Sequence, residues 1–262
     1  MTLLSVIGLG IDFGGITAVN ALDFDVQPGE IVSIIGPNGA GKTTLFNMIS
    51  GIYQPSRGHV VLEGRDVTDM EPHKLAERGM SRTFQNLQSF DQMTALENVM
   101  VGCHMSERSP IWADLLRLPS SSRRNRQTQE KAMALLERVH LVKAAHMEAS
   151  SLSYGALKRI DIARALACDP KILLLDEPAA GCNAVETEEI DELIAEIAKE
   201  GVAILLVEHD MKLVMKISDH VIALNYGEKL AEGKPSEISR DPKVVEAYLG
   251  SHGGKEAAHA LG

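Results

Sequence analysis

The stretch Gly36-Pro37-Asn38-Gly39-Ala40-Gly41-Lys42-Thr43-Thr44 fits G-x-x-x-x-G-K-[ST], the pattern of a phosphate-binding loop. It follows the apolar, β-branched run Ile31–Ile35 and precedes the helix-like segment Leu45–Ser50, so it joins a strand to a helix. Glycines let such a loop turn its N–H groups toward phosphate oxygens, and the helix start adds the positive end of its dipole. We therefore expect the whole stretch to bind nucleotide, with Lys42 reaching the β- and γ-phosphates and the Thr43 hydroxyl ligating Mg²⁺.

Length, charge and cysteine content narrow the class of protein. A chain of 262 residues can bury the core of one large domain. Its formal net charge of −10 argues against nucleic acid or an anionic lipid surface as the main partner. It has no apolar run of the roughly 18 residues that span a membrane, and no basic start typical of a signal peptide. The 3 cysteines are too far apart for a C-x-x-C motif, and an odd number suits a reducing cytosol.

Apolar patterns predict how the rest of the chain is organised. The expected strands are 3–13, 22–26, 31–35, 58–62, 81–84, 171–175, 203–207, 221–224 and 228–232. The expected helices are 72–78, 154–167, 186–199, 211–217, 235–239 and 243–249. Between residues 94 and 149 helical periodicity dominates, as in Lys131–Val139, which predicts an inserted helical subdomain. No internal repeat occurs, so we expect one nucleotide-binding unit.

Residues 106–126 differ from the rest of this helical segment. They carry apolar side chains around Trp112, then a serine run and Arg123-Arg124. A short amphipathic helix followed by a basic connector explains the pattern. Two interpretations stay open: a surface helix packed on its own subdomain, and a docking surface for another protein.

Two carboxylates follow the apolar run Ile172–Leu175 directly. In an open α/β sheet the ligand site lies at the carboxyl ends of the strands. We expect Asp176 to hold Mg²⁺, directly or through water, and Glu177 to orient or deprotonate a water that attacks the γ-phosphate. The second carboxylate favours hydrolysis over transfer to another substrate. The alternative is a solvated strand end.

The stretch Leu152-Ser153-Tyr154-Gly155-Ala156 resembles L-S-G-G-Q, the signature sequence of the ATP-binding cassette (ABC) ATPases. Ser153 suits the first position of a helix, where its hydroxyl and nearby N–H groups bind an anion. The resemblance implies that Ser153 and Gly155 contact the γ-phosphate of an ATP held by an opposite subunit, so that two subunits enclose two ATP molecules. Tyr154 and Ala156 depart from the family pattern, and we expect altered dimer contacts there.

Two further stretches match motifs of that family. His209 follows the expected strand 203–207 and resembles the switch histidine that contacts the γ-phosphate. Gln85, in Arg82-Thr83-Phe84-Gln85-Asn86, resembles the glutamine that meets Mg²⁺ and the attacking water.

Two lesser positions complete the set. Phe13 lies where the family has an aromatic ring stacked on adenine, and the alternative is a core phenylalanine of the first strand. Asn183, in Gly181-Cys182-Asn183-Ala184, matches a dimer-contacting loop that usually reads G-L-N-P. The resemblance therefore adds Phe13 and Asn183 to the residues expected to bind ATP.

The resemblance also implies the fold, an α/β P-loop NTPase of ABC type. It predicts a mixed sheet core with an antiparallel β subdomain and an inserted helical subdomain. We expect a single ABC ATPase domain over residues 1–262. Residues 1–85 and 160–249 would form the nucleotide-binding core, residues 86–159 the helical subdomain with the signature, and residues 250–262 a flexible tail.

Finer matches resemble the ATPases of branched-chain amino-acid importers. They include Phe13-Gly14-Gly15, Glu208-His209-Asp210-Met211 and Ala247-Tyr248-Leu249-Gly250, and residues 112–126 are similar to the longer of that system's two cassettes. The resemblance implies ATP and Mg²⁺, a second ATPase subunit, identical or different, two transmembrane permease subunits and, indirectly, an external solute-binding protein. It places the chain at the cytoplasmic face of the membrane, without nucleic acid. Alternatives are the ATPase of a lipid or lipopolysaccharide exporter, and an ATP-dependent switch outside transport.

Overall fold

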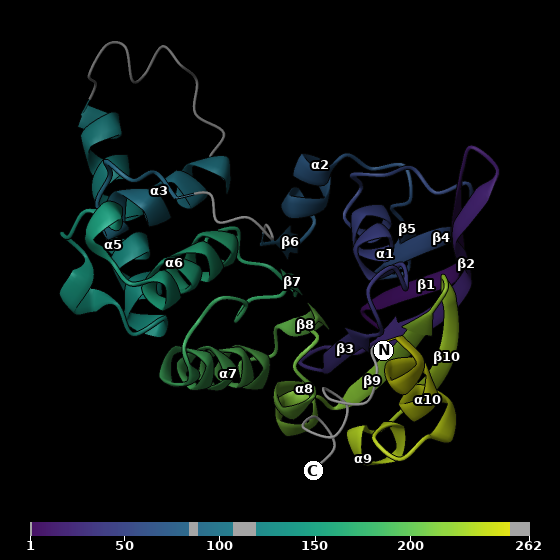
Figure 1. Cartoon of the computed structure of the whole chain (residues 1–262). Coiled ribbons are helices and arrows are strands. Elements are labelled where there is room, and N and C mark those ends of the chain that lie inside the picture. Colours follow the sequence, from purple (N-terminus) through teal and green to yellow (C-terminus); the bar gives the residue numbers. More distant parts are fainter. Residues whose placement is uncertain (1, 84–88, 107–118, 252–262) are drawn as a thin grey trace. The chain divides into compact units, whose positions relative to one another are not determined.

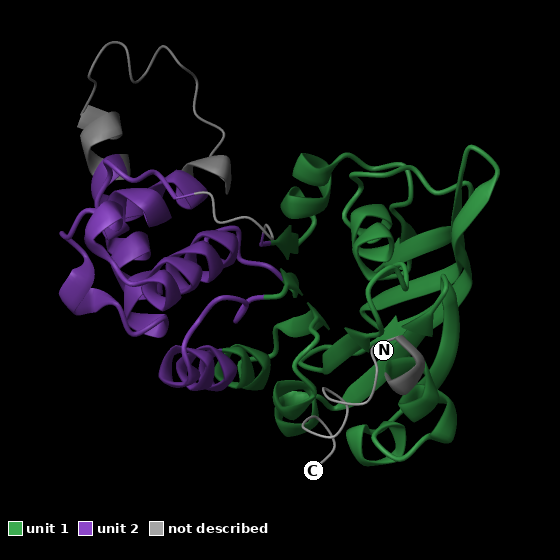
Figure 2. Ribbon diagram, viewed as in Figure 1, with its two compact units in different colours: residues 1–82, 171–177, 194–262 green, residues 83–170, 178–193 purple. Residues whose placement is uncertain are grey.

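The computed structural model describes residues 2–83, 89–106 and 119–251 (Figure 1). The chain divides into two compact units (Figure 2). The first unit holds residues 1–82, 171–177 and 194–262, and the second holds residues 83–170 and 178–193. The functional boundaries expected at residues 85/86 and 159/160 stay a prediction.

A six-stranded sheet of order β10-β9-β3-β8-β7-β6 organises the first unit. Its strands are β3 (Ile31–Ile35), β6 (Met80–Arg82), β7 (Ile172–Asp176), β8 (Ala203–Val207), β9 (His220–Asn225) and β10 (Glu228–Gly233). All neighbouring pairs are parallel except β9 with β10. Every residue of β3, β7 and β8 is buried, which explains why their sequences are apolar except for Ser33 and Asp176.

The sheet brings three strand ends to one edge. Val207 of β8 pairs with Ile34 of β3 on one side and with Asp176 of β7 on the other. Because these strands are parallel, the residues that follow each of them emerge together. We call this place the phosphate-loop edge, made of residues 36–43, 176–177 and 208–209.

Apolar clusters lie on both faces of the six-stranded sheet within the first unit, the second of them along β3, β9 and β10. One face shares a buried apolar cluster with α1 (Lys42–Ile49) and the smaller sheet, and it includes Ile34 and Leu224. The other face contributes Ile35 and Val221 to a cluster with helices on the opposite side. These helices are α8 (Met211–Ile217), α9 (Pro235–Ile238) and α10 (Pro242–Ser251). The short α2 (Pro72–Glu77) precedes β6.

An antiparallel sheet of order β2-β1-β4-β5 completes the first unit. Its strands are β1 (Leu4–Phe13), β2 (Ile16–Val26), β4 (Arg57–Leu62) and β5 (Arg65–Asp66). Gly14 and Gly15 join β1 to β2 with φ angles of 53° and 89°, the signs that a tight two-residue hairpin requires. The mixed sheet together with this antiparallel sheet confirms the predicted α/β fold class.

The described elements of the second unit are helical. They are α3 (Ala95–Ser106), α5 (Pro119–Arg138), the 3₁₀ turns η1 (Val142–Ala144) and η2 (Ala149–Ser151), α6 (Tyr154–Leu166) and the first part of α7 (Ala184–Lys199). Helices α3 and α6 approach closely, because a Cβ at Gly102 would lie 2.5 Å from the carbonyl oxygen of Arg164. The fully buried Asn98 closes the turn before α3 with bonds to both backbone groups of Phe90.

Most expected elements occur, and β3, β8 and α8 have the expected bounds. The strand expected at 22–26 begins earlier, at Ile16, because the glycine hairpin continues the pairing with β1 through residues 16–21, which are mostly exposed. The strand expected at 81–84 is Met80–Arg82, and the helix around 131–139 is the end of the longer α5. The amphipathic helix around Trp112 and residues 252–262 of the expected flexible tail lie outside the described residues. The expected basic connector at Arg123-Arg124 is wrong, because both residues belong to α5, and residues 250–251 of the expected tail belong to α10. In the part of the chain that is described, no helix is long and apolar enough to cross a membrane.

Candidate functional site

The loop between β3 and α1 has a conformation that only glycine permits at two positions. A Cβ at Gly36 would lie 2.3 Å from the carbonyl oxygen of Leu224. Gly41 has a φ of 98° immediately before α1, in the region that disfavours side chains. The spacing of glycines in the sequence is thus explained by close backbone approach and left-handed geometry.

Lys42 lies inside this loop. Its ammonium donates to the carbonyl oxygens of Gly36 and Pro37 at 2.6 and 3.2 Å. Burial lowers the pKa of Lys42, and the charges of Glu177 and Asp176 oppose that shift. The predicted phosphate-binding lysine and the two predicted carboxylates therefore lie at the same sheet edge, near enough for their charges to interact.

Asp176 is held by an arginine for which we predicted no role. The guanidinium of Arg82 donates to Asp176 Oδ2 at 3.0 Å, to Asn47 Oδ1 at 2.7 Å and to Ser50 Oγ at 2.8 Å. The Asp176 side chain is only 1% exposed, and burial lowers the pKa of Arg82 against the opposing effect of Asp176. The sequence offered one signal, a basic residue inside the expected strand 81–84.

Glu177 and His209 lie together at the ends of neighbouring strands. Glu177 adopts a left-handed φ of 49°, uncommon for a residue with a side chain, and its N–H donates to Val207 O at 2.9 Å. His209 Nδ1 lies 3.8 Å from Glu177 Oε1 and 3.7 Å from Glu208 Oε2. The expected general base and switch histidine are thus brought within reach of one another.

The other predicted residues of the first unit are placed as follows. Asn38, Gly39 and Thr43 are exposed, and Ala40 is buried beneath the loop. Thr44 lies half-buried in the first turn of α1. Gln85 lies outside the described residues.

Phe13 is not a core residue. Its side chain is 46% exposed at the end of β1, and its ring meets the ring of Tyr53 edge to face with centroids 5.7 Å apart. This exposure rules out the core alternative and leaves a ring face available for stacking.

The signature turn, Ser153–Gly155, begins α6 in the second unit. The Ser153 hydroxyl accepts from the N–H of Ala156 at 3.3 Å, as expected of a helix cap. The N–H of Gly155 donates to Glu186 Oε1 at 3.2 Å. A hydrogen bond from Ser153 is the main cause that lowers the pKa of Glu186, followed by the backbone N–H of Asn183.

Asn183 starts the next helix of the same unit. Its Oδ1 accepts from the N–H groups of Val185 and Glu186 at 3.0 and 3.1 Å, and its own N–H donates to Glu186 Oε2 at 3.2 Å. This reciprocal pair is a capping box at the start of α7. Glu186 was absent from the predicted site, although its spacing of three from an asparagine is the usual signal for such a box.

Tyr154, which replaces a glycine of the family signature, lies over Gly181. A Cβ at Gly181 would lie 3.0 Å from the Tyr154 ring, and the ammonium of Lys158 lies 5.7 Å from the ring centre. The tyrosine at this position therefore fits because Gly181, in the loop after Asp176 and Glu177, has no side chain.

The chemistry of the donors suits Mg²⁺ bound to a nucleotide. Among the described residues no group of three or more His, Cys, Asp or Glu side chains could hold a metal by itself. Mg²⁺ commonly takes one or two carboxylates together with substrate phosphates and waters. This coordination preference fits Asp176, a single carboxylate beside a phosphate-binding loop that also carries the exposed hydroxyl of Thr43.

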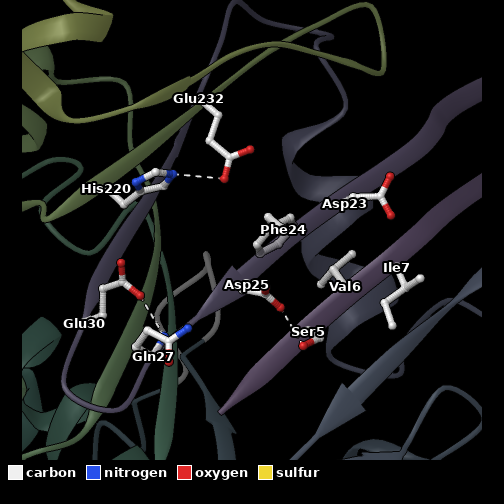
Figure 3. A pocket seen from close by; sticks show the side chains of 10 residues that line it. All are labelled: Ser5, Val6, Ile7, Asp23, Phe24, Asp25, Gln27, Glu30, His220 and Glu232. Carbon is white, nitrogen blue, oxygen red and sulfur yellow. Dashed lines mark hydrogen bonds and ion pairs between the residues drawn. The ribbon is translucent and has the colours of Figure 1, made fainter. Parts of the chain in front are cut away.

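A pocket of about 650 Å³ lies elsewhere in the first unit (Figure 3). Asp23, Asp25, Glu30 and Glu232 supply its acidic lining, and Glu232 is bonded to His220 at 3.0 Å. None of the predicted site residues lines it, and its charge is opposite to that needed for phosphate. This pocket is therefore a poor candidate for the phosphate site that the sequence predicts at the phosphate-loop edge.

Comparison with known proteins adds independent evidence. Residues 19–180 match the family model described as ABC transporter, and residues 228–253 match the one described as branched-chain amino acid ATP-binding cassette transporter. The chain is 46% identical over 249 residues to the high-affinity branched-chain amino acid transport ATP-binding proteins BraF of Pseudomonas aeruginosa and LivG of Escherichia coli. In both cases 95% of this chain and 98% of the relative are covered. A solved ADP conformation of an ATP-binding cassette of an ABC transporter has a TM-score of 0.83 at 33% identity, covering 95% of this chain and 99% of that one.

Proposed function

This chain belongs to the ABC transporter ATP-binding proteins, and on that premise we propose that it hydrolyses ATP to energise an importer of branched-chain amino acids. The observation that carries the ATPase role is geometric: Ile34 of β3 and Asp176 of β7 both pair with Val207 of β8, so the loop with Lys42 and the carboxylates Asp176 and Glu177 emerge at one sheet edge. Their charges are near enough to interact there. The cargo rests on the two relatives and on the family match of residues 228–253.

Each residue at the phosphate-loop edge has a proposed task. The loop Gly36–Thr44 binds the phosphates, and Lys42 neutralises the β- and γ-phosphate charge. Glu177 accepts a proton from the attacking water, and His209 contacts the γ-phosphate from the neighbouring strand end. Phe13 stacks on the adenine.

Thr43, Asp176 and Gln85 would hold Mg²⁺ when it is bound. The ion would supply positive charge that offsets the charge developing on the phosphates. Arg82 is a positioning residue for this site, because its ion pair with Asp176 fixes the orientation of the carboxylate and balances its charge when no ion is bound.

The signature turn serves a second nucleotide. Ser153, Gly155 and Asn183 would face the ATP of an opposite ATPase subunit, the same chain or a different one. Closure of that pair would move two transmembrane permease subunits, and an external binding protein would deliver the solute to them. The chain would then lie at the cytoplasmic face of the membrane. The exporter and switch alternatives are not favoured, because BraF and LivG are named as amino acid transport proteins.

Uptake of labelled leucine tests both parts of the proposal. Cells that lack this chain are complemented with the wild type or with Glu177→Gln, and ATP turnover of each purified protein is measured beside ATP binding. We expect only the wild type to restore uptake, and Glu177→Gln to bind ATP but hydrolyse it at least about a hundredfold more slowly. Leucine uptake that is unaffected by loss of the chain would refute the cargo and leave the ATPase role intact, whereas near-normal turnover would remove Glu177 from the mechanism.

A further inference from the structure

The carboxylate of Glu186 joins the starts of two helices in the second unit. Its Oε2 completes the capping box of its own helix, α7, through the N–H of Asn183. Its Oε1 accepts from the N–H of Gly155 in α6, 31 positions away in the sequence. A capping box explains the first bond but gives no reason for the second.

Glu186 also fills the space in front of the signature turn. A Cβ placed on Gly155 would lie 2.7 Å from Cβ, Cγ and Cδ of Glu186. The side chain thus lies along the Gly155 backbone, and only a glycine at this position leaves room for it. Another anion could not use the Gly155 N–H without displacing the carboxylate.

The hydrogen-bond donors that bind the Glu186 carboxylate are the same groups that we propose to bind phosphate. The N–H of Gly155 donates to its carboxylate, and the Ser153 hydroxyl lowers its pKa by hydrogen bonding. Both donors lie at a helix start, where the dipole favours any negative group. In the proposed function they receive the γ-phosphate held by the opposite subunit.

We propose that Glu186 is a positioning residue that sets the affinity of the signature turn for ATP. Its carboxylate stands in for the γ-phosphate at Ser153 and Gly155, and closure of the ATPase pair must displace it. The displaced charge stays on the first turn of α7 and repels the incoming phosphate. This inference rests on the proposed function, because it assumes that these donors bind the γ-phosphate.

Competition and simple capping predict opposite effects of Glu186→Gln. The amide removes the negative charge yet keeps an oxygen that can accept at the capping position. If Glu186 only supports the fold, the substitution weakens the signature region and the closed pair. If Glu186 competes with phosphate, the substitution strengthens the closed pair even though α7 is capped less well.

The test is ATP-dependent dimerisation of the full chain, with Glu177→Gln present so that ATP persists. Dissociation constants are measured by sedimentation for this parent, for the parent with Glu186→Gln and for the parent with Glu192→Gln. Glu192 is an exposed carboxylate on the same helix, so its substitution controls for the loss of one charge. We expect Glu186→Gln to tighten the dimer about fivefold and Glu192→Gln to change it by less than about twofold.

A dimer that is no tighter with Glu186→Gln than with Glu192→Gln would overturn the proposal. A parent that stays monomeric at saturating ATP would instead count against the enclosure of ATP by two copies of this chain. Hydrogen exchange of the Gly155 amide, measured without nucleotide, then tests separately whether Glu186 occupies this donor, which the proposal requires. Exchange should accelerate with Glu186→Gln alone, and an unchanged rate would refute the competing contact.

Discussion

The phosphate-loop edge and the signature turn hold their functional groups in different ways. At the edge, Lys42 is bound by carbonyls of its own loop, five and six positions away. At the signature turn, the Gly155 N–H is bound by a carboxylate 31 positions away on another helix. The first arrangement is local, so its sequence motif is complete, whereas the second depends on a partner that lies outside the motif.

Their tolerance of change differs accordingly. The loop keeps every residue of the phosphate-binding pattern, since Gly36 has the backbone of Leu224 within 2.3 Å of any added Cβ. The signature departs at Tyr154, which packs over Gly181 in a loop of the same unit. Tertiary contacts compensate there for a residue that the motif alone would reject.

Removing Arg82 should give the largest effect of the four, a loss of stability. It tests whether the phosphate-loop edge, like the signature turn, also depends on a partner far away in the sequence. Arg82→Ala leaves the buried Asp176 carboxylate without its cation, and we expect a loss of about 3 kcal/mol in the free energy of unfolding. Urea titration measures this. Arg82→Lys keeps the charge but not the forked geometry and should lose less. Equal stability of the alanine variant and the wild type would refute a structural role for the pair.

Lys42→Ala should impair ATP binding with little change in fold. The loop loses the cation that we propose for the β- and γ-phosphates, and we expect affinity for ATP to fall by at least about tenfold. Calorimetry of the purified chain measures the dissociation constant. Lys171→Ala is the matched control, because Lys171 belongs to the same unit and pairs with Glu63. Unchanged affinity of Lys42→Ala would contradict the assignment of the loop.

Tyr248 links the phosphate loop to the last described helix and gives a test by pH. Burial raises its pKa to about 12, although the backbone of Gly36 acts in the opposite direction. Because the folded pKa lies above the ordinary value of 10.0, the folded state retains this proton longer. Its stabilising contribution is therefore complete below pH 10 and is lost as the pH rises toward 12.

Tyr248→Phe removes this titration, so its stability should fall less steeply than that of the wild type between pH 10 and 12. The difference in slope should be at most about 1.4 kcal/mol per pH unit. Thermal unfolding of both proteins across this range measures it. Parallel curves would show that the phenol ionises equally well in the folded and unfolded chain.

Asn183→Ala should give the smallest loss of stability, and it tests the helix start that Glu186 links to the signature turn. The variant removes the side-chain oxygen that caps α7, at a cost of about 1 kcal/mol. Asn183→Asp keeps an acceptor and should be close to the wild type. A thermal midpoint that is equal for alanine and asparagine would mean that the box with Glu186 does not stabilise this helix start.

Several features followed from the sequence because their causes are short-range. Strand β8 is a continuous apolar run and β3 is apolar except for Ser33. Both are followed by a polar or glycine residue, and their bounds were predicted correctly. Glycine spacing indicated the phosphate loop, since backbone turns with positive φ favour glycine locally. The family resemblance was confirmed by the comparisons.

The remaining features were decided by tertiary structure. Arg82 and Asp176 are 94 positions apart and meet only because β6 and β7 are neighbours in the sheet. The strand order likewise brings Glu177 beside His209, and the packing of two helices brings Glu186 to Gly155. A sequence pattern reports the local preferences of the backbone and the burial of each face, but which distant partner completes a charge or a hydrogen bond depends on how the elements pack.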